Sequence, residues 1–232
     1  MLKEENTYLK GLIKAILVIL FYLIATSCPI EFAHLIDINI YKLSNILKSI
    51  YLILYESAVL AIVIYAYKTE LIQCFKNFSI KEFFDKYFKY WFLILVLMII
   101  SNSIVINFTT TDTSNNQEII MEGLKVLPLY ILFSTIIFAP LMEEIIFRFC
   151  IKKIIPKPSI IYILVSGLLF GSMHVILTMT DITDLLFIIP YSIPGIVFAY
   201  LYNKTDNIFI PAGMHFIHNG SLMLLQIILT LV

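Results

Sequence analysis

Charged side chains are scarce in this chain of 232 residues: 16 Lys and Arg and 16 Asp and Glu residues make up 14% of the sequence. In a soluble domain roughly a quarter of the residues would be charged. The net charge is zero and no basic run alternates with aromatics, which argues against a nucleic-acid partner. With 60% hydrophobic residues and a mean hydropathy of +0.94, the composition indicates a membrane protein.

Cysteine is rare as well. Cys28, Cys74 and Cys150 form no CxxC pair and are too few for a disulfide framework, so we expect each to be a small apolar filler. The chain also lacks the HExxH motif of zinc proteases. We therefore predict neither a metal nor a cofactor.

Long apolar runs, by contrast, are abundant, and about twenty residues suffice to span a bilayer. We predict an all-α polytopic membrane helical bundle of about seven transmembrane helices, at residues 11–33, 46–67, 90–108, 124–151, 159–180, 184–202 and 207–231. Residues 70–88 mix aromatics with lysines and predict an interfacial amphipathic helix, with a solvated connector as the alternative. Pro190 and the Pro194–Gly195 pair are expected to break the sixth span.

The distribution of lysine predicts the orientation, because lysines are enriched in cytoplasmic loops. They gather in the N-terminal segment and in the second, fourth and sixth loops: Lys3, Lys10, Lys68, Lys76, Lys81, Lys86, Lys89, Lys152, Lys153, Lys157 and Lys204. The first loop, with Lys42 and Lys48, is ambiguous. We predict a cell-membrane protein with its N-terminus in the cytoplasm. A cleaved signal peptide is the alternative for the first span, but its apolar run continues past Ala25–Cys28, which favours a retained helix.

Three ionisable residues interrupt the fourth apolar run: Glu143, Glu144 and Arg148, the only arginine in the chain. Such residues are costly inside a membrane and indicate function. Glu144 and Arg148 stand four apart, acid first, which suits an ion pair on one helix face, while Glu143 points about 100° away. Pro140 predicts a kink just before them that frees the carbonyl near Ile136.

The fifth and seventh spans each carry two candidate site residues with four-residue spacing: Phe170 with His174, and His215 with Asn219. At 1.5 Å per residue, Glu143 and His215 lie roughly 12 Å from the cytoplasmic ends of their spans and His174 roughly 20 Å. The greater depth of His174 speaks against their meeting, unless helix tilt compensates.

Together these residues resemble the CAAX-processing and bacteriocin-processing (CPBP, or Abi) intramembrane endopeptidases. Residues 143–148 (EEIIFR) are similar to the EExxxR motif of that family, residues 170–174 (FGSMH) to FxxxH, and residues 215–219 (HFIHN) to HxxxN. The resemblance covers about residues 125–222. Phe149, where many members have glycine, and His218 depart from the pattern.

The resemblance implies a metal-independent glutamate protease. In that scheme Glu143 is the general base, His174 holds the same water, and His215 and Asn219 present donors to the developing oxyanion. Glu144 with Arg148 would fix the base or bind substrate, and Phe170 would pack around the site. Residues 1–110 would then form N-terminal helices and the interfacial helix, and residues 111–232 the catalytic core of one structural domain.

Structural and non-catalytic interpretations of these residues remain open. Glu144 and Arg148 can be a structural ion pair, and His215 and Asn219 can bind backbone carbonyls at a helix crossing. The whole chain can be a non-catalytic scaffold, regulator or bacteriocin immunity protein, or a zinc protease with Glu143, His174 and His215 as ligands. Glu56, an acid in the second span, is expected to line a cavity or pair with a tyrosine and receives no role.

The expected partners are the lipid bilayer and a peptide or lipidated-protein substrate, as in the family, where prenylated C-termini, bacteriocin leaders or small peptide signals are cleaved. The sequence does not define an oligomeric state. With the predicted orientation, we expect the site to open toward the cytoplasmic side.

Overall fold

The computed structural model describes residues 2–109, 111–156 and 158–231, so the predicted loop residue Lys157 lies outside it. Within that part of the chain all regular structure is helical, and six helices are long and apolar enough to cross a membrane, or seven if one bent pair counts as a span. The predicted all-α polytopic bundle is confirmed.

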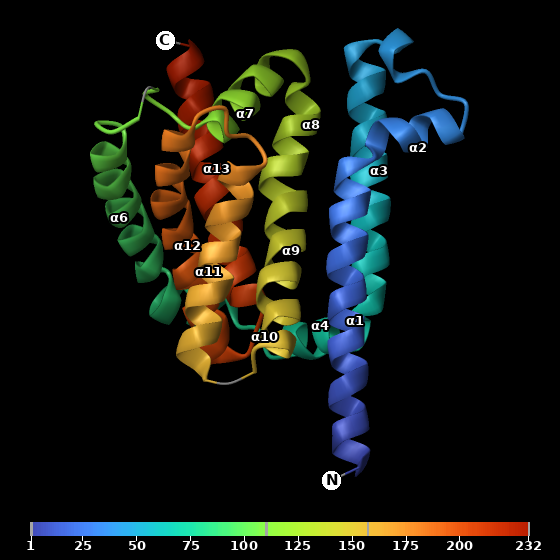
Figure 1. The fold of residues 1–232 in the computed structure, drawn as a ribbon, viewed down its shortest axis with the longest axis vertical. Coiled ribbons are helices and arrows are strands. Elements are labelled where there is room, and N and C mark those ends of the chain that lie inside the picture. Colours follow the sequence, from blue (N-terminus) through green and yellow to red (C-terminus); the bar gives the residue numbers. More distant parts are fainter. Residues whose placement is uncertain (1, 110, 157, 232) are drawn as a thin grey trace.

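Seven segments make up these spans: α1 (Leu2–Ser27), α3 (Asn45–Ala66), α6 (Lys89–Val105), the continuous run of α8 (Pro128–Phe133), α9 (Ala139–Glu144) and α10 (Ile151–Ile154), α11 (Ser159–Ile176), α12 (Ile188–Thr205) and α13 (Phe209–Leu231). Shorter helices join them: α2 (Pro29–Leu35), α4 (Lys68–Lys76), α5 (Ile80–Glu82) and α7 (Asn115–Val126). In Figure 1, α1 and α3 lie together on one side of the bundle and α6 on the other, with α8 to α13 between them.

Two predicted boundaries are wrong. The first span ends at Ser27 rather than at residue 33, because Pro29 begins the separate helix α2. The predicted interfacial helix 70–88 is two pieces: α4 ends at Lys76, and after Ser79 caps the next turn the chain continues through α5 into α6 with a bend of 48°.

The bundle has two distinct ends. At one, which we call the lysine-rich end, Lys14 of α1 binds Glu70 of α4 at 2.9 Å, and Lys152 of α10 binds Asp206 after α12 at 3.1 Å. At the other, the α7 end, Asn115 donates to the carbonyl of Thr178 and to Asp184. Figure 1 shows the N-terminus at the lysine-rich end and the C-terminus at the α7 end.

Glycines bring α11 unusually close to α12. A Cβ on Gly171 would lie 2.7 Å from the backbone nitrogen of Ser192, and one on Gly167 would lie 2.7 Å from that of Ile196. Gly167 and Gly171 form a GxxxG pattern, which lets two membrane helices touch through their backbones. This contact fixes the helix that carries Phe170 and His174. The prolines of α12 do not break it: α12 is continuous from Ile188 to Thr205 with Pro194 inside.

The predicted kink at Pro140 takes another form. Residues Ser134–Phe138 make a π-helical turn before α9, in which the N–H of Ala139 bonds to the carbonyl of Ser134, five residues back. In this register the missing N–H of Pro140 leaves the carbonyl of Thr135, next to Ile136, without a backbone donor. A second π-helical segment, Ile145–Cys150, follows the two acids.

Candidate active site

Glu143 is the point where three of the predicted residues meet. It lies on α9, is 6% exposed, and its Oε2 atom is 3.9 Å from Nε2 of His174 on α11 and 3.9 Å from Nε2 of His215 on α13. The depth that the sequence gave His174 therefore does not keep it from the other two. Oε2 of Glu143 is buried and has no hydrogen-bond partner in the structure.

Glu144, the neighbouring acid, is fully paired. Its carboxylate accepts bonds from Nε of Arg148 at 2.7 Å and from Nη2 at 3.2 Å, and it bonds Nδ1 of His215 at 3.1 Å. Arg148 also donates to Ser166 on α11, which in turn donates to the carbonyl of Phe147. We call Glu144, Arg148, Ser166 and Nδ1 of His215 the paired cluster. Its acid and its guanidinium are both completely buried.

The hydrogen bonds of the two histidines orient their rings. Nδ1 of His174 lies 2.9 Å from the carbonyl of Phe170, and Nδ1 of His215 faces the carboxylate of Glu144. Because both partners are acceptors, the proton of each neutral ring is on Nδ1. Each Nε2 then turns a lone pair toward Glu143, so three proton acceptors face one another.

Aromatic rings hold this arrangement. Phe170 lies between the two imidazoles, with ring centroids 4.7 Å from His174 and 5.5 Å from His215, and the guanidinium of Arg148 is 5.2 Å from its centre. Tyr191 of α12 stacks on His174 at 5.0 Å. The ring of Phe170 therefore contacts three side chains of the site.

Asn219, the fourth predicted residue, has a structural contact. Its Nδ2 donates to the carbonyl of Thr135 at 2.9 Å. That carbonyl is the one that Pro140 leaves without an N–H, so Asn219 satisfies a buried backbone group of the π-helical turn. The amide still has a second N–H, and Asn219 lines the same cavity as Glu143.

A cavity of about 500 Å³ contains this site. Its wall includes residues of α1, of α7 and of the segment just after α11, which Figure 1 shows near α7: Tyr22, Leu23, Thr26, Ser27, Asn116, Gln117, Ile120, Leu177 and Thr178. The cavity therefore runs from Glu143 toward the α7 end. The lysine-rich loops lie at the opposite end of the bundle, and the orientation of the chain in the membrane stays a prediction.

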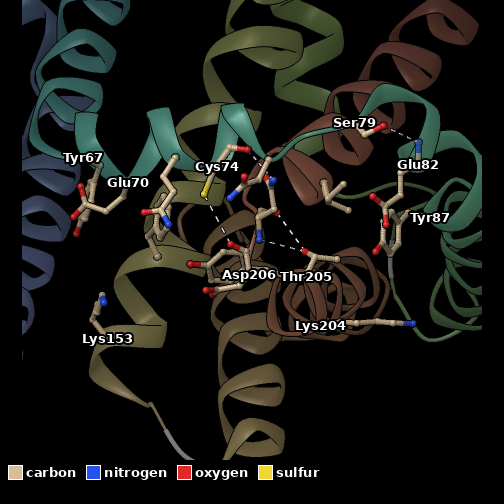
Figure 2. Close-up of a pocket in the computed structure, with 16 residues that line it drawn as sticks. Tyr67, Glu70, Cys74, Ser79, Glu82, Tyr87, Lys153, Lys204, Thr205 and Asp206 are labelled. Atoms are coloured by element: carbon tan, nitrogen blue, oxygen red, sulfur yellow. Dashed lines mark hydrogen bonds between the residues drawn. The ribbon is translucent and has the colours of Figure 1, made fainter.

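A second cavity, of about 530 Å³, lies at the lysine-rich end and does not include Glu143. Figure 2 shows its lining, among it Glu70, Cys74 and Asp206. Partial burial works against ionisation of Glu70, but the hydrogen bond and charge of Lys14 outweigh it and hold the pKa of Glu70 below its ordinary value.

Sequence reasoning missed several contacts of the site. Ser166 precedes Phe170 and His174 at steps of four, a spacing that places all three on one face of α11 and would have revealed it. Glu56 was expected to line a cavity or pair with a tyrosine, and it accepts a hydrogen bond from Tyr130 at 2.9 Å; the second bond, from Ser134 at 2.9 Å, was not foreseen. Tyr191 carried no spacing signal, because it belongs to another helix.

No group of three or more His, Cys, Asp or Glu side chains in the described ranges has a geometry suited to a metal ion. His218, the extra histidine of the third motif, is buried, lines the cavity, and its Nδ1 has no hydrogen-bond partner.

Comparisons with known proteins agree with the motifs. Residues 125–221 match the family described as type II CAAX prenyl endopeptidase Rce1-like. The protein "Putative membrane peptidase YdiL" of Bacillus subtilis (strain 168) is 30% identical over 116 residues, which are 49% of this chain and 44% of that protein. The chain thus spans less than half the length of this curated relative. No solved structure matches the chain. All three motifs fall inside the matched region, and the resemblance to the CPBP family is confirmed.

Proposed function

We propose, from the place of residues 125–221 in the CAAX endopeptidase (CPBP) family, that this chain is an intramembrane endopeptidase that hydrolyses a peptide bond with a water activated by Glu143. One observation supports this most directly. A buried carboxylate oxygen without a hydrogen-bond partner lies beside a cavity, 3.9 Å from each of two imidazoles that come from two other membrane helices.

The ring orientations suggest how the proton moves. A water among Glu143, His174 and His215 can donate its two hydrogens to two of the three acceptors. Glu143 takes the proton as the oxygen attacks the peptide carbonyl, and returns it to the leaving amine when the tetrahedral intermediate collapses. The oxyanion needs a donor. Nε2 of His215 can supply one only when it carries a proton, while Nδ1 keeps the ring oriented against the carboxylate of Glu144.

Asn219 can assist in two ways. One N–H holds the carbonyl of Thr135 and so fixes the turn before Glu143, and the other is available to the oxyanion within the cavity. Glu144 and Arg148 act through His215 and through the shape of the helix, because in this structure neither lines the cavity.

The test is cleavage by the purified protein in proteoliposomes. Fluorescently labelled casein and quenched peptides with and without a farnesylated C-terminus serve as probes, and comparative peptidomics of membranes identifies natural products. We expect Glu143→Ala to abolish the wild-type products while the protein accumulates normally. Wild-type turnover by Glu143→Ala would refute the assignment. Complementation of a deletion phenotype by Glu143→Gln would instead favour a non-catalytic scaffold or regulator.

A zinc protease is the second candidate, for one reason. The Nδ1 contacts of His174 and His215 leave Nε2 free toward Glu143, which is also how metal-binding imidazoles are oriented. Exhaustive chelation separates the two cases. The glutamate mechanism predicts undiminished cleavage, whereas a zinc enzyme would lose activity and regain it on addition of zinc.

A further inference from the structure

The wall of the catalytic cavity is uneven. Toward the α7 end it reaches the last turn of α1 and the segment just after α11, where Thr26, Ser27 and Thr178 line it together with Asn116 and Gln117 of α7. Most of the remaining lining is apolar: Leu23, Met98, Ile120, Ile131, Met173, Leu177, Leu222 and Met223. A cavity with apolar walls and a few polar groups suits a hydrophobic peptide.

Toward the lysine-rich end the path from Glu143 is filled. Every residue of Ile145–Cys150 is buried. The ring of Phe149 stacks on Tyr67 at 5.5 Å and meets Tyr202 edge-on at 5.5 Å. These three rings line the second cavity on their far side, so they separate it from the site. Figure 2 shows Tyr67 in that lining.

The helix α1 is held mainly at one end. Toward the other helices of the bundle it packs against Ile145–Cys150 and α10, both on the lysine-rich side of Glu143, while on its outer side Tyr55 of α3 donates to the carbonyl of Ala25 at 2.8 Å. Beside the cavity, the one side-chain hydrogen bond described between α1 and α11 joins the hydroxyl of Tyr22 to the sulfur of Met173 at 3.7 Å. Sulfur is a weak acceptor, so this contact is easily opened.

We infer that substrate reaches Glu143 from the α7 end, as a hydrophobic peptide segment that passes between α1 and α11, and that the lysine-rich end is closed to it. If the lysine-rich loops face the cytoplasm, the segment is presented from the extracytoplasmic half of the membrane. The direction of access follows from the cavity itself; the peptide nature of the occupant rests on the proposed function.

Cysteine accessibility tests the direction without any need for activity. The background carries Cys28→Ala, Cys74→Ala and Cys150→Ala. Single cysteines then replace Ser134 or Met223 inside the catalytic cavity, Thr178 near its α7 end, and Gln73 in the cavity at the lysine-rich end. A small membrane-impermeant methanethiosulfonate reagent is applied to intact cells of a single-membrane host and to inverted vesicles, and reacted thiols are read from a maleimide gel shift.

We expect Ser134→Cys and Met223→Cys to react from the same side as Thr178→Cys and from the opposite side to Gln73→Cys. Reaction from the side of Gln73→Cys would overturn the inference. So would protection of both deep cysteines from either side while Thr178→Cys and Gln73→Cys react. A chain without protease activity that still shows the expected labelling would refute the proposed function and leave the direction of access standing.

Discussion

The two neighbouring acids of the fourth span lie in regions with opposite properties. The carboxylate of Glu144 accepts two hydrogen bonds from Arg148 and forms a third with Nδ1 of His215, so its charge is matched. Around Glu143, one carboxylate oxygen is buried without a partner and a cavity begins. The polar groups of the paired cluster satisfy one another, as in a protein core, whereas the carboxylate of Glu143 has an unsatisfied oxygen beside a cavity.

This contrast shows that burial alone does not distinguish the two acids. Glu144 is 0% exposed and Glu143 is 6% exposed, so the two would be ranked alike by depth. They differ in what faces them. A paired carboxylate contributes to structure, whereas a buried carboxylate without partners is costly and is retained where a reaction needs it. The predictions below test this division.

The largest effect is expected from Glu143→Gln. The amide keeps the size of the side chain but cannot take a proton, so cleavage of labelled casein should fall by about 10²–10⁴-fold. Because no bond is lost at Oε2, the unfolding midpoint in detergent micelles should stay the same or rise. A fall in the unfolding midpoint as large as the one expected for Glu144→Gln would contradict the proposed difference between Glu143 and Glu144.

Glu144→Gln should act mainly on stability. It leaves the buried guanidinium of Arg148 without a counter-charge, at a cost of about 3–5 kcal/mol in the free energy of unfolding. The double variant Glu144→Gln with Arg148→Met should recover much of that loss. The exposed pair of Glu82 and Lys86 has the same spacing, and Glu82→Gln should cost only about 0.5 kcal/mol or less. Equal losses at the two pairs would contradict the assignment of a paired cluster.

A double-mutant cycle can decide what Asn219 does. Asn219→Ala leaves the carbonyl of Thr135 without a donor and should cost about 1–3 kcal/mol of stability. Pro140→Ala restores a backbone N–H to the turn, so in that background the stability loss should shrink. If the cleavage rate falls equally in both backgrounds, the second N–H of the amide serves the reaction directly. An unchanged stability loss in the Pro140→Ala background would argue against the proposed role in the turn.

The smallest effect is expected at Glu56. Glu56→Gln keeps an oxygen that can accept from Tyr130 and Ser134, so the stability change should stay below about 1.5 kcal/mol, with little change in cleavage. A loss of cleavage comparable to that of Glu143→Gln would mean that the chemistry extends beyond the region around Glu143.

Much of the fold follows from the sequence because hydrophobic length is a strong signal. Hydrophobic length predicts the spans, and four-residue spacing predicts the ion pair of Glu144 with Arg148. The presence of an acid inside a span singles out Glu143 as a candidate functional residue. The meeting of Glu143 with His174 was less clear, since straight rods of 1.5 Å per residue place them at different depths. In the structure the two side chains lie 3.9 Å apart, and the position of α11 depends on its close packing against α12 at Gly167 and Gly171, which only tertiary contact determines.

Other features depended on backbone geometry that composition does not reveal. The π-helical turn at Ser134–Phe138 determines which carbonyl Pro140 leaves without a backbone donor, and with it the partner of Asn219. The direction of the cavity depends on where α1 packs against the bundle, because residues of α1 form part of its wall. Loop charges report on the orientation in the membrane but not on which end of a bundle is hollow.

The π-helical turn before α9 also makes this region sensitive to changes in chain length. Such a turn holds one residue more than an α-helix would, and each residue rotates the following side chains by about 100°. Deleting a single residue between Ser134 and Phe138 would allow an ordinary helix and leave Glu143 facing the two histidines. The same deletion after the turn, within α9, would instead move Glu144 to the place of Glu143, so the position of a deletion decides which acid faces the histidines.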